Sequence, residues 1–261
     1  MMVFLLLVSF FASVGGAICG IGGGVIIKPA LDALNIASVS TISFLSGCTV
    51  LSMSCYSVGK ALAAKESLVD FKTGTPLALG GAVGGIVGKS LFSALTAMFS
   101  QQSVGICQSL CLAALTLMTI CYTLNQRRIH THHITNPVVC VLVGLVLGIL
   151  SSFLGIGGGP INLVVLYYFF SMSTKVAAQN SLYIILISQI TSLGTTLLTG
   201  AVPPFQWSWL ILMVVGGISG GMVGRKINKR IDDRQVERLF IGLMVIITLI
   251  SLYNAWRFWA A

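Results

Sequence analysis

The sequence of 261 residues has too few charged side chains for a soluble protein. Hydrophobic residues make up 56% of the chain and Asp, Glu, Lys and Arg only 8%, whereas a soluble domain carries about 25% charged residues. This composition excludes a soluble enzyme or a nucleic-acid-binding domain, and the net charge of +9 is better explained by basic residues that flank membrane spans. The expected environment is therefore a lipid bilayer, and the mean hydropathy of +0.98 agrees with it.

Long apolar segments predict membrane-spanning helices along the whole chain, because a spanning helix needs about 20 mostly apolar residues. The first of them lacks a basic n-region and runs straight into a motif that recurs later, so we interpret it as part of the mature protein. Two shorter apolar stretches, 25–36 and 160–172, each follow a glycine cluster. We predict an all-α polytopic membrane protein with glycine-broken helices or re-entrant hairpins. The expected spans are 3–19, 38–59, 74–88, 103–123, 137–154, 176–199, 207–224 and 238–256.

Two glycine-rich patterns occur twice, at nearly the same spacing. The sequence GIGGG at Gly20–Gly24 recurs 135 residues later at Gly155–Gly159. A GGxxGGxxG helix followed by a basic residue ends first at Lys89 and again, 136 residues later, at Arg225. We expect this second pattern to pack helices closely, because small residues let backbones approach one another.

A looser match, with a spacing of 140, joins Ala37–Thr41 to Ala177–Ser181. Collinear repetition of this kind predicts a duplicated chain. We place a first transmembrane repeat at 1–124 and a second at 125–261, with about four to five helical elements in each.

The distribution of basic residues predicts that the two repeats are inverted. The segment 60–72 holds three lysines, whereas its counterpart 200–206 has no charge. The segment 225–238 holds six basic residues, whereas we expect its counterpart 89–102 to be a loop with only Lys89. The positive-inside rule then puts equivalent loops on opposite sides, and both termini outside the cytoplasm. Inverted repeats are typical of secondary transporters, whose binding site lies near the bilayer midplane.

The two triple-glycine runs predict an anion-binding site. Three consecutive glycines break a helix, and irregular backbone at membrane depth requires surrounding protein or a water-filled cavity. A helix that starts after such a break directs free N–H groups and the positive end of its dipole towards the cavity. We therefore expect an anionic substrate to bind at Gly22, Gly23, Gly24, Gly157, Gly158 and Gly159.

Lys28 and several polar side chains extend this predicted site. Lys28 lies in an apolar stretch, where a charge at the bilayer centre costs about 2.5–3.5 kcal/mol. It either faces the substrate, or snorkels or pairs with Asp32 one turn later, and the Asp32 pair is also compatible with a substrate-facing lysine. Hydroxyl and amide groups on the following helices suit a sulfonyl or carboxylate oxygen, or alternatively join neighbouring helices. These groups belong to Ser40, Thr41, Asn180, Ser181 and Gln189.

No metal, cofactor or catalytic group is expected. The seven cysteines are scattered singly through apolar runs, which indicates buried thiols that act as small hydrophobes. His130, His132 and His133 lie in the central loop without a carboxylate or a cysteine beside them. This loop is interpreted as a solvated linker.

The paired GIGGG motifs, each followed by an Ala-x-x-[Ser/Asn]-[Thr/Ser] stretch and a GGxxGGxxG-[Lys/Arg] helix, resemble the TauE/SafE sulfite exporter family of bacterial membrane permeases. The resemblance covers nearly the whole chain. It implies movement of sulfite or an organosulfonate such as sulfoacetate across the bacterial inner membrane, usually outward. It also implies that the glycine loops, Thr41 and Asn180–Ser181 line the anion site.

We therefore predict a secondary transporter that works by alternating access and exports a small sulfur-containing anion. One negative charge that leaves an inside-negative cell gains about 2.3 kcal/mol per 100 mV, so efflux needs no coupling ion. Two alternatives stay open at this stage. One is an anion channel or facilitator, and the other is a membrane-embedded enzyme.

Overall fold

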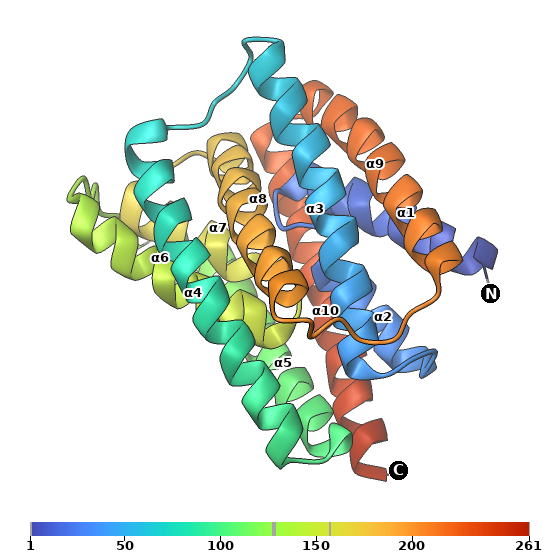
Figure 1. The fold of residues 1–261 in the computed structure, drawn as a ribbon. Coiled ribbons are helices and arrows are strands. Elements are labelled where there is room, and N and C mark those ends of the chain that lie inside the picture. Colours follow the sequence, from blue (N-terminus) through green and yellow to red (C-terminus); the bar gives the residue numbers. More distant parts are fainter. Residues whose placement is uncertain (1, 127–128, 157, 261) are drawn as a thin grey trace.

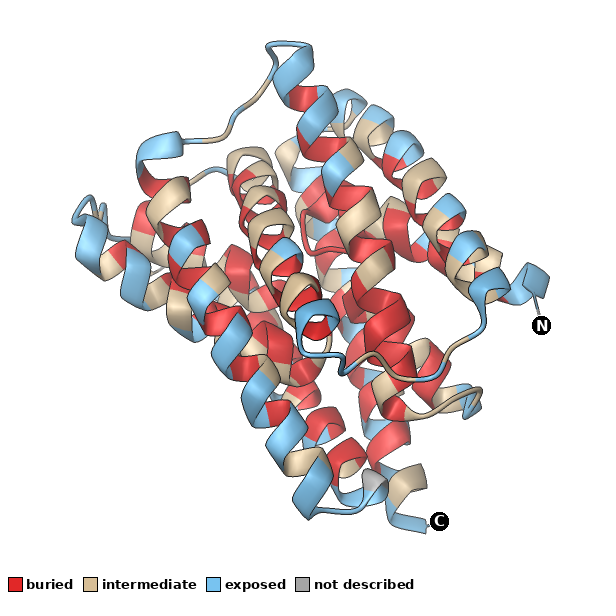
Figure 2. Ribbon diagram, viewed as in Figure 1, coloured by how far each residue is buried: buried red, intermediate tan, exposed pale blue. Residues whose placement is uncertain are grey.

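The computed structural model describes residues 2–126, 129–156 and 158–260, and all their regular structure is helical (Figure 1). Eight of the ten helices in this part of the chain are long and apolar enough to cross a membrane, and α2 and α7 are shorter. Exposed positions run along the outer helices (Figure 2), and many of them are large apolar residues. The protein is a multi-pass membrane protein. Its helices are α1 (Met2–Cys19), α2 (Gly24–Leu34), α3 (Val39–Ala63), α4 (Phe71–Met98), α5 (Gln101–Asn125), α6 (Pro137–Leu154), α7 (Pro160–Phe170), α8 (Thr174–Leu198), α9 (Trp207–Arg230) and α10 (Asp233–Ala260).

Several helices continue past the apolar segments that predicted them. The helix α9 runs through a basic stretch to Arg230, and α10 already begins at Asp233. The helix α4 reaches Met98, so the expected loop at 89–102 was wrong. Lys89 lies within α4, about 14 Å before its end at 1.5 Å per residue.

Glycines pack α4 against α6 and α9 against α1, as the repeated pattern predicted. A Cβ on Gly80, Gly84 or Gly88 would overlap the backbone of α6, and one on Gly220 or Gly224 would overlap the backbone of α1. These residues recur every four positions, on one face of each helix. The α6 groups in closest approach are the carbonyls of Val141, Leu145 and Ile149, and those of α1 are the carbonyls of Leu6, Phe10 and Val14.

The helices of the second half repeat those of the first at an almost constant spacing. The bounds of α1 and α6 differ by 135 residues, as do those of α3 and α8, and the bounds of α2 and α7 differ by 136. This spacing pairs Thr41 with Val176 and Ser46 with Ser181, so the looser alignment at a spacing of 140 was wrong. In Figure 1, α3 and α8 run in opposite directions, and so do α4 and α9.

Candidate functional site

The two GIGGG segments lie against each other among the helices. Gly24, the first residue of α2, has no room for a Cβ because the carbonyl oxygen of Ile156 fills that space. Ile185 of α8 packs against both Gly22 and Gly158. The structure therefore brings the two helix breaks together, and α2 and α7 both begin at this junction.

The space beside these helix starts holds both apolar and polar side chains, since Ser13 Oγ would lie 3.0 Å from a Cβ on Gly23 and a small pocket beside Gly158 is lined by Asn162 and Ser188. The N-cap residues Gly23 and Gly159 offer no side chain to the first turn of α2 or α7. A Cβ on Gly22 would lie 3.4 Å from both Ile185 and Val50. Gly157 lies outside the described residues. The glycine junction is a close helix crossing in this structure, and the anion site predicted there stays a prediction.

Lys28 forms a buried ion pair with Asp32 beside this junction. Its Nζ lies 2.7 Å from Asp32 Oδ2, and the two side chains are 4% and 5% exposed. The Lys28 side chain also approaches Gly155, where a Cβ would lie 3.1 Å from Lys28 Cε. The other carboxylate oxygen, Asp32 Oδ1, is buried without a hydrogen-bond partner among the described residues. The structure thus contains the Lys28–Asp32 pair, and contact of Lys28 with the substrate stays a prediction.

Thr41 and Asn180 hold loops at opposite ends of α3 and α8. The Thr41 hydroxyl donates to the Pro204 carbonyl, over 3.1 Å. The Asn180 amide accepts from the Asp70 N–H and donates to the Leu68 carbonyl, over 3.1 and 3.2 Å. The structure therefore does not bring these two predicted site residues together.

The three remaining predicted residues have different surroundings. Ser40 is half-buried near the start of α3. Ser181 is fully buried, and its hydroxyl has no hydrogen-bond partner in the described part of the chain. Gln189 lies opposite Gly47 of α3, where a Cβ would be 3.3 Å from Gln189 Oε1. Only Gln189 lines a polar pocket.

This polar pocket lies between α3, α4, α6 and α8 and contains Lys89, so we call it the Lys89 pocket. Its cavity volume is about 30 Å³. The Lys89 Nζ lies 5.5 Å from the ring centroid of Phe92, and no acidic side chain of the described residues lies within 4 Å of it. The lining residues are Ser43, Phe44, Gly47, Lys89, Phe92, Ser151, Ser152, Gly155, Gln189, Ser192, Leu193 and Thr196.

Two hydroxyls in the Lys89 pocket lack protein partners. The Oγ atoms of Ser43 and Ser152 are buried without a hydrogen-bond partner among the described residues, and both side chains are 8% exposed. An unsatisfied buried polar group costs about 1–3 kcal/mol. A bound ligand with oxygen atoms would remove this cost, because hydroxyls and the Lys89 ammonium all donate hydrogen bonds.

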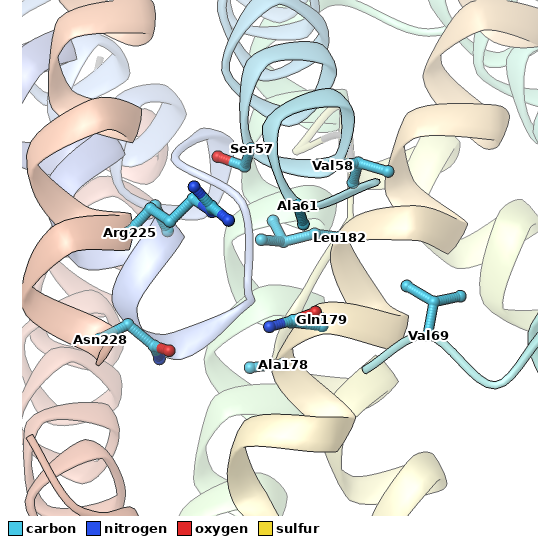
Figure 3. Close-up of a pocket in the computed structure, with 10 residues that line it drawn as sticks. Ser57, Val58, Ala61, Val69, Ala178, Gln179, Leu182, Arg225 and Asn228 are labelled. Carbon is cyan, nitrogen blue, oxygen red and sulfur yellow. The ribbon is translucent and has the colours of Figure 1, made fainter. Parts of the chain in front are cut away.

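A second pocket lies between α3, α8 and α9 and contains Arg225, so we call it the Arg225 pocket (Figure 3). The Arg225 guanidinium and the Ser57 hydroxyl point towards each other across it. The Ser57 side chain is 5% exposed, and its Oγ has no partner among the described residues. The lining residues are Ala17, Ser57, Val58, Ala61, Val69, Ala178, Gln179, Leu182, Arg225 and Asn228.

The two pockets are made from equivalent positions of the two halves. At the spacing of 135–136 residues that the helix bounds give, every lining residue of the Arg225 pocket except Val69 has its counterpart in the Lys89 pocket. Three alanines of the Arg225 pocket correspond to hydroxyl residues in the Lys89 pocket. These pairs are Ala17 with Ser152, Ala61 with Thr196 and Ala178 with Ser43.

Sequence reasoning missed Lys89 and Arg225 as pocket residues. The signal was present, because both residues end the same repeated glycine pattern. They were assigned to membrane topology, since a charge at the end of an apolar run reads as a helix boundary. Both instead lie inside helices, one each in α4 and α9.

The described residues hold no group of three or more His, Cys, Asp or Glu side chains that could bind a metal ion. His130, His132 and His133 are exposed, and His132 stacks edge-on against Tyr168. The pocket chemistry is that of cationic and hydroxyl donors, which suits anions rather than metals.

The family model and the relatives that the chain matches are all described as membrane transporters or exporters. A family model described as "Sulfite exporter TauE/SafE" matches residues 5–251. A "Probable membrane transporter protein YunE" of Bacillus subtilis (strain 168) is 24% identical over 269 residues, covering 97% of this chain and 97% of the relative. A "Probable membrane transporter protein" of Xylella fastidiosa (strain Temecula1) is 27% identical over 250 residues, covering 93% of this chain and 90% of the relative. No solved structure matches the chain.

Proposed function

Because the chain belongs to the TauE/SafE sulfite exporter family and is a membrane transporter of that type, we propose that it moves a small sulfur-containing anion, such as sulfite or an organosulfonate, through the Lys89 pocket. The observation that carries this proposal is a cationic side chain beside the buried hydroxyls of Ser43 and Ser152, which have no partner among the described residues. The ammonium and hydroxyls are all donors to anion oxygens.

Charge balance favours an anion at Lys89. A lysine at the bilayer centre costs about 2.5–3.5 kcal/mol, and no carboxylate of the described residues offsets Lys89. Lys28 differs, since Asp32 already neutralises it at 2.7 Å. A substrate anion would provide for Lys89 what Asp32 provides for Lys28.

We propose that transport proceeds by alternating access of two inverted repeats, 1–124 and 125–261. The opposite directions of α3 and α8 and of α4 and α9 support this arrangement (Figure 1). So does the matched glycine packing of α4 on α6 and of α9 on α1. In transporters of this kind, one repeat rocks against the other around a fixed site.

Direction and placement follow from charge. Glu66 binds Arg225 and Lys229, which joins the basic segments 60–72 and 225–237 at one end of the molecule. The positive-inside rule puts this end in the cytoplasm and both termini outside it, in the bacterial inner membrane. Outward movement of an anion then gains about 2.3 kcal/mol per 100 mV, so we propose export.

Counterflow of radiolabelled sulfite in proteoliposomes tests the proposal. Lys89→Gln should lower the initial rate at least tenfold, since a hydrogen bond to a charged group contributes about 1.5–3 kcal/mol. Lys60→Gln is the matched control, because Lys60 is an exposed lysine at the end of α3 and should leave the rate unchanged. A thermal-shift series with sulfite, thiosulfate, sulfoacetate, taurine and dicarboxylates would identify the preferred anion.

Two results would contradict this assignment. Equal rates for Lys89→Gln and the wild type would remove the Lys89 pocket from the pathway. A sulfite flux that neither saturates nor responds to sulfite on the opposite side would indicate a channel rather than a carrier.

A further inference from the structure

The Arg225 pocket differs from the Lys89 pocket in one charged contact. Arg225 Nη2 lies 3.0 Å from Glu66 Oε2, and Lys229 Nζ binds the same carboxylate oxygen. Glu66 belongs to the segment between α3 and α4. At the spacing of 135 residues its counterpart in the second half is Ala201, which has no charge. An acidic side chain therefore lies at one pocket and not at the equivalent place of the other.

The Glu66 carboxyl group is deprotonated at neutral pH. The hydrogen bond from Lys229, together with the positive charges of Lys229 and Arg225, holds the pKa of the Glu66 carboxyl below its usual value. The Glu66 side chain is 48% exposed and that of Arg225 17%. Since water reaches Glu66, its carboxylate can leave the guanidinium at little cost.

We propose that the Arg225 pocket is a second binding site for the same transported anion, at which the Glu66 carboxylate occupies the guanidinium until the substrate displaces it. This inference rests on the proposed function and adds to it a second site on the opposite face. The Arg225 guanidinium already binds one oxyanion in this structure. The buried Ser57 hydroxyl, without a partner among the described residues, points at it across the pocket (Figure 3).

The chemistry of the two pockets predicts unequal affinity. Ala17, Ala61 and Ala178 stand where the Lys89 pocket has hydroxyl residues. The Arg225 pocket therefore offers fewer hydroxyl donors, and its arginine is already paired with the competing Glu66 carboxylate. An exported anion would enter at this weaker site on the cytoplasmic face.

Sided transport kinetics test the second site. Initial rates of radiolabelled sulfite movement are measured against concentration in inside-out and right-side-out membrane vesicles. Arg225→Gln should raise KM about tenfold on one face only, because it removes a charge-assisted hydrogen bond. Glu66→Gln should lower KM on that same face about two- to fivefold, as expected for a partly exposed competing ion pair. Vmax should change little.

Three further variants make the test specific. The double variant Glu66→Gln/Arg225→Gln should have the KM of Arg225→Gln alone, because Glu66 affects anion binding by competing for Arg225, whatever its contact with Lys229 adds to stability. Arg225→Lys should retain much of the wild-type KM, and it also covers the possibility that Arg225→Gln fails to fold. Lys226→Gln is the matched control for surface charge, because Lys226 is an exposed residue of α9 outside the pocket, and it should leave KM unchanged.

The outcomes separate this inference from the proposed function. If Glu66→Gln changes Vmax on both faces without changing KM, Glu66 only joins two segments by ion pairs, and the proposal of a second site is wrong. If sulfite movement depends on Lys89 while Arg225→Gln leaves KM unchanged on both faces, only the proposal of a second site is rejected. If the wild type moves no sulfur anion at all, both proposals are overturned.

Discussion

Helices α2 and α7 have the same length and the same position in their halves, yet they carry different chemistry. Each has 11 residues and begins at the glycine junction. In α2, Lys28 and Asp32 form a buried ion pair. At the spacing of 136 residues, α7 has Val164 and Tyr168 in their places. The ion pair is therefore not needed to form this short helix.

The last turns of the two helices also have different partners. In α2, the carbonyls of Asp32 and Ala33 accept from Arg257 Nη1 of α10, over 2.9 and 2.6 Å. In α7, the carbonyl of Tyr168 accepts instead from the backbone N–H of His132 in the central linker, over 2.8 Å. The end carbonyls of any helix need partners. In α2 an arginine side chain adds to the backbone bond from the Asn35 N–H, whereas the bonds described at the end of α7 come from backbone N–H groups. Duplication thus conserves the position of a short helix better than the groups that satisfy it.

Breaking the Lys28–Asp32 pair, which α7 lacks, should lower the stability of the protein more than any other change to these helices. Asp32→Asn leaves the Lys28 charge buried and unpaired, and should lower the free energy of unfolding by about 3–5 kcal/mol. Thermal unfolding of the purified protein in detergent measures this. The paired replacement Lys28→Met/Asp32→Leu, which makes α2 apolar like α7, should restore most of the loss.

Transport by the paired replacement tests whether Lys28 also binds the substrate. If it moves sulfite at the wild-type rate, the pair is structural and Lys28 does not bind the substrate. A folded but inactive paired variant would contradict that and return Lys28 to the binding site predicted from the sequence.

The sequence predicts the helices far better than the pockets. The eight spans, the two helix breaks and the close packing of the glycine helices all follow from local rules about length and residue size. The ends of α4 and α9 do not, because apolar counting stops at the first charge whereas helical hydrogen bonding continues through Lys89 and Arg225. The loop contacts of Asn180 join segments about 110 residues apart in sequence, and no local pattern records such a pairing.

Substitutions of the packed glycines should cause the next largest loss of stability, and this loss should be similar in the two halves. A Cβ on Gly84 would overlap the Leu145 carbonyl, and one on Gly220 would overlap the Phe10 carbonyl. Gly84→Ala and Gly220→Ala should each destabilise the protein by about 1–3 kcal/mol through overpacking. Thermal unfolding in detergent again gives the measurement.

Gly242→Ala is the control for these variants, because nothing lies within 4 Å of its added Cβ. Alanine stabilises a helix interior by roughly 0.5–1 kcal/mol relative to glycine, so Gly242→Ala should be neutral or stabilising. A large loss for Gly220→Ala with none for Gly84→Ala would show that the two interfaces are not equivalent.

The smallest effect is expected from a side-chain contact that α10 makes with α2. Asn254 Nδ2 of α10 donates to the Pro29 carbonyl over 2.9 Å, and Asn254 is 2% exposed. Asn254→Ala should cost about 1 kcal/mol, the usual net value of a neutral hydrogen bond. Asn125 donates to the Cys121 carbonyl over 2.8 Å but is exposed, so water replaces its amide and Asn125→Ala should fall within about 0.5 kcal/mol of the wild type. Equal losses of unfolding free energy for the two variants would mean that burial adds nothing to the Asn254 contact.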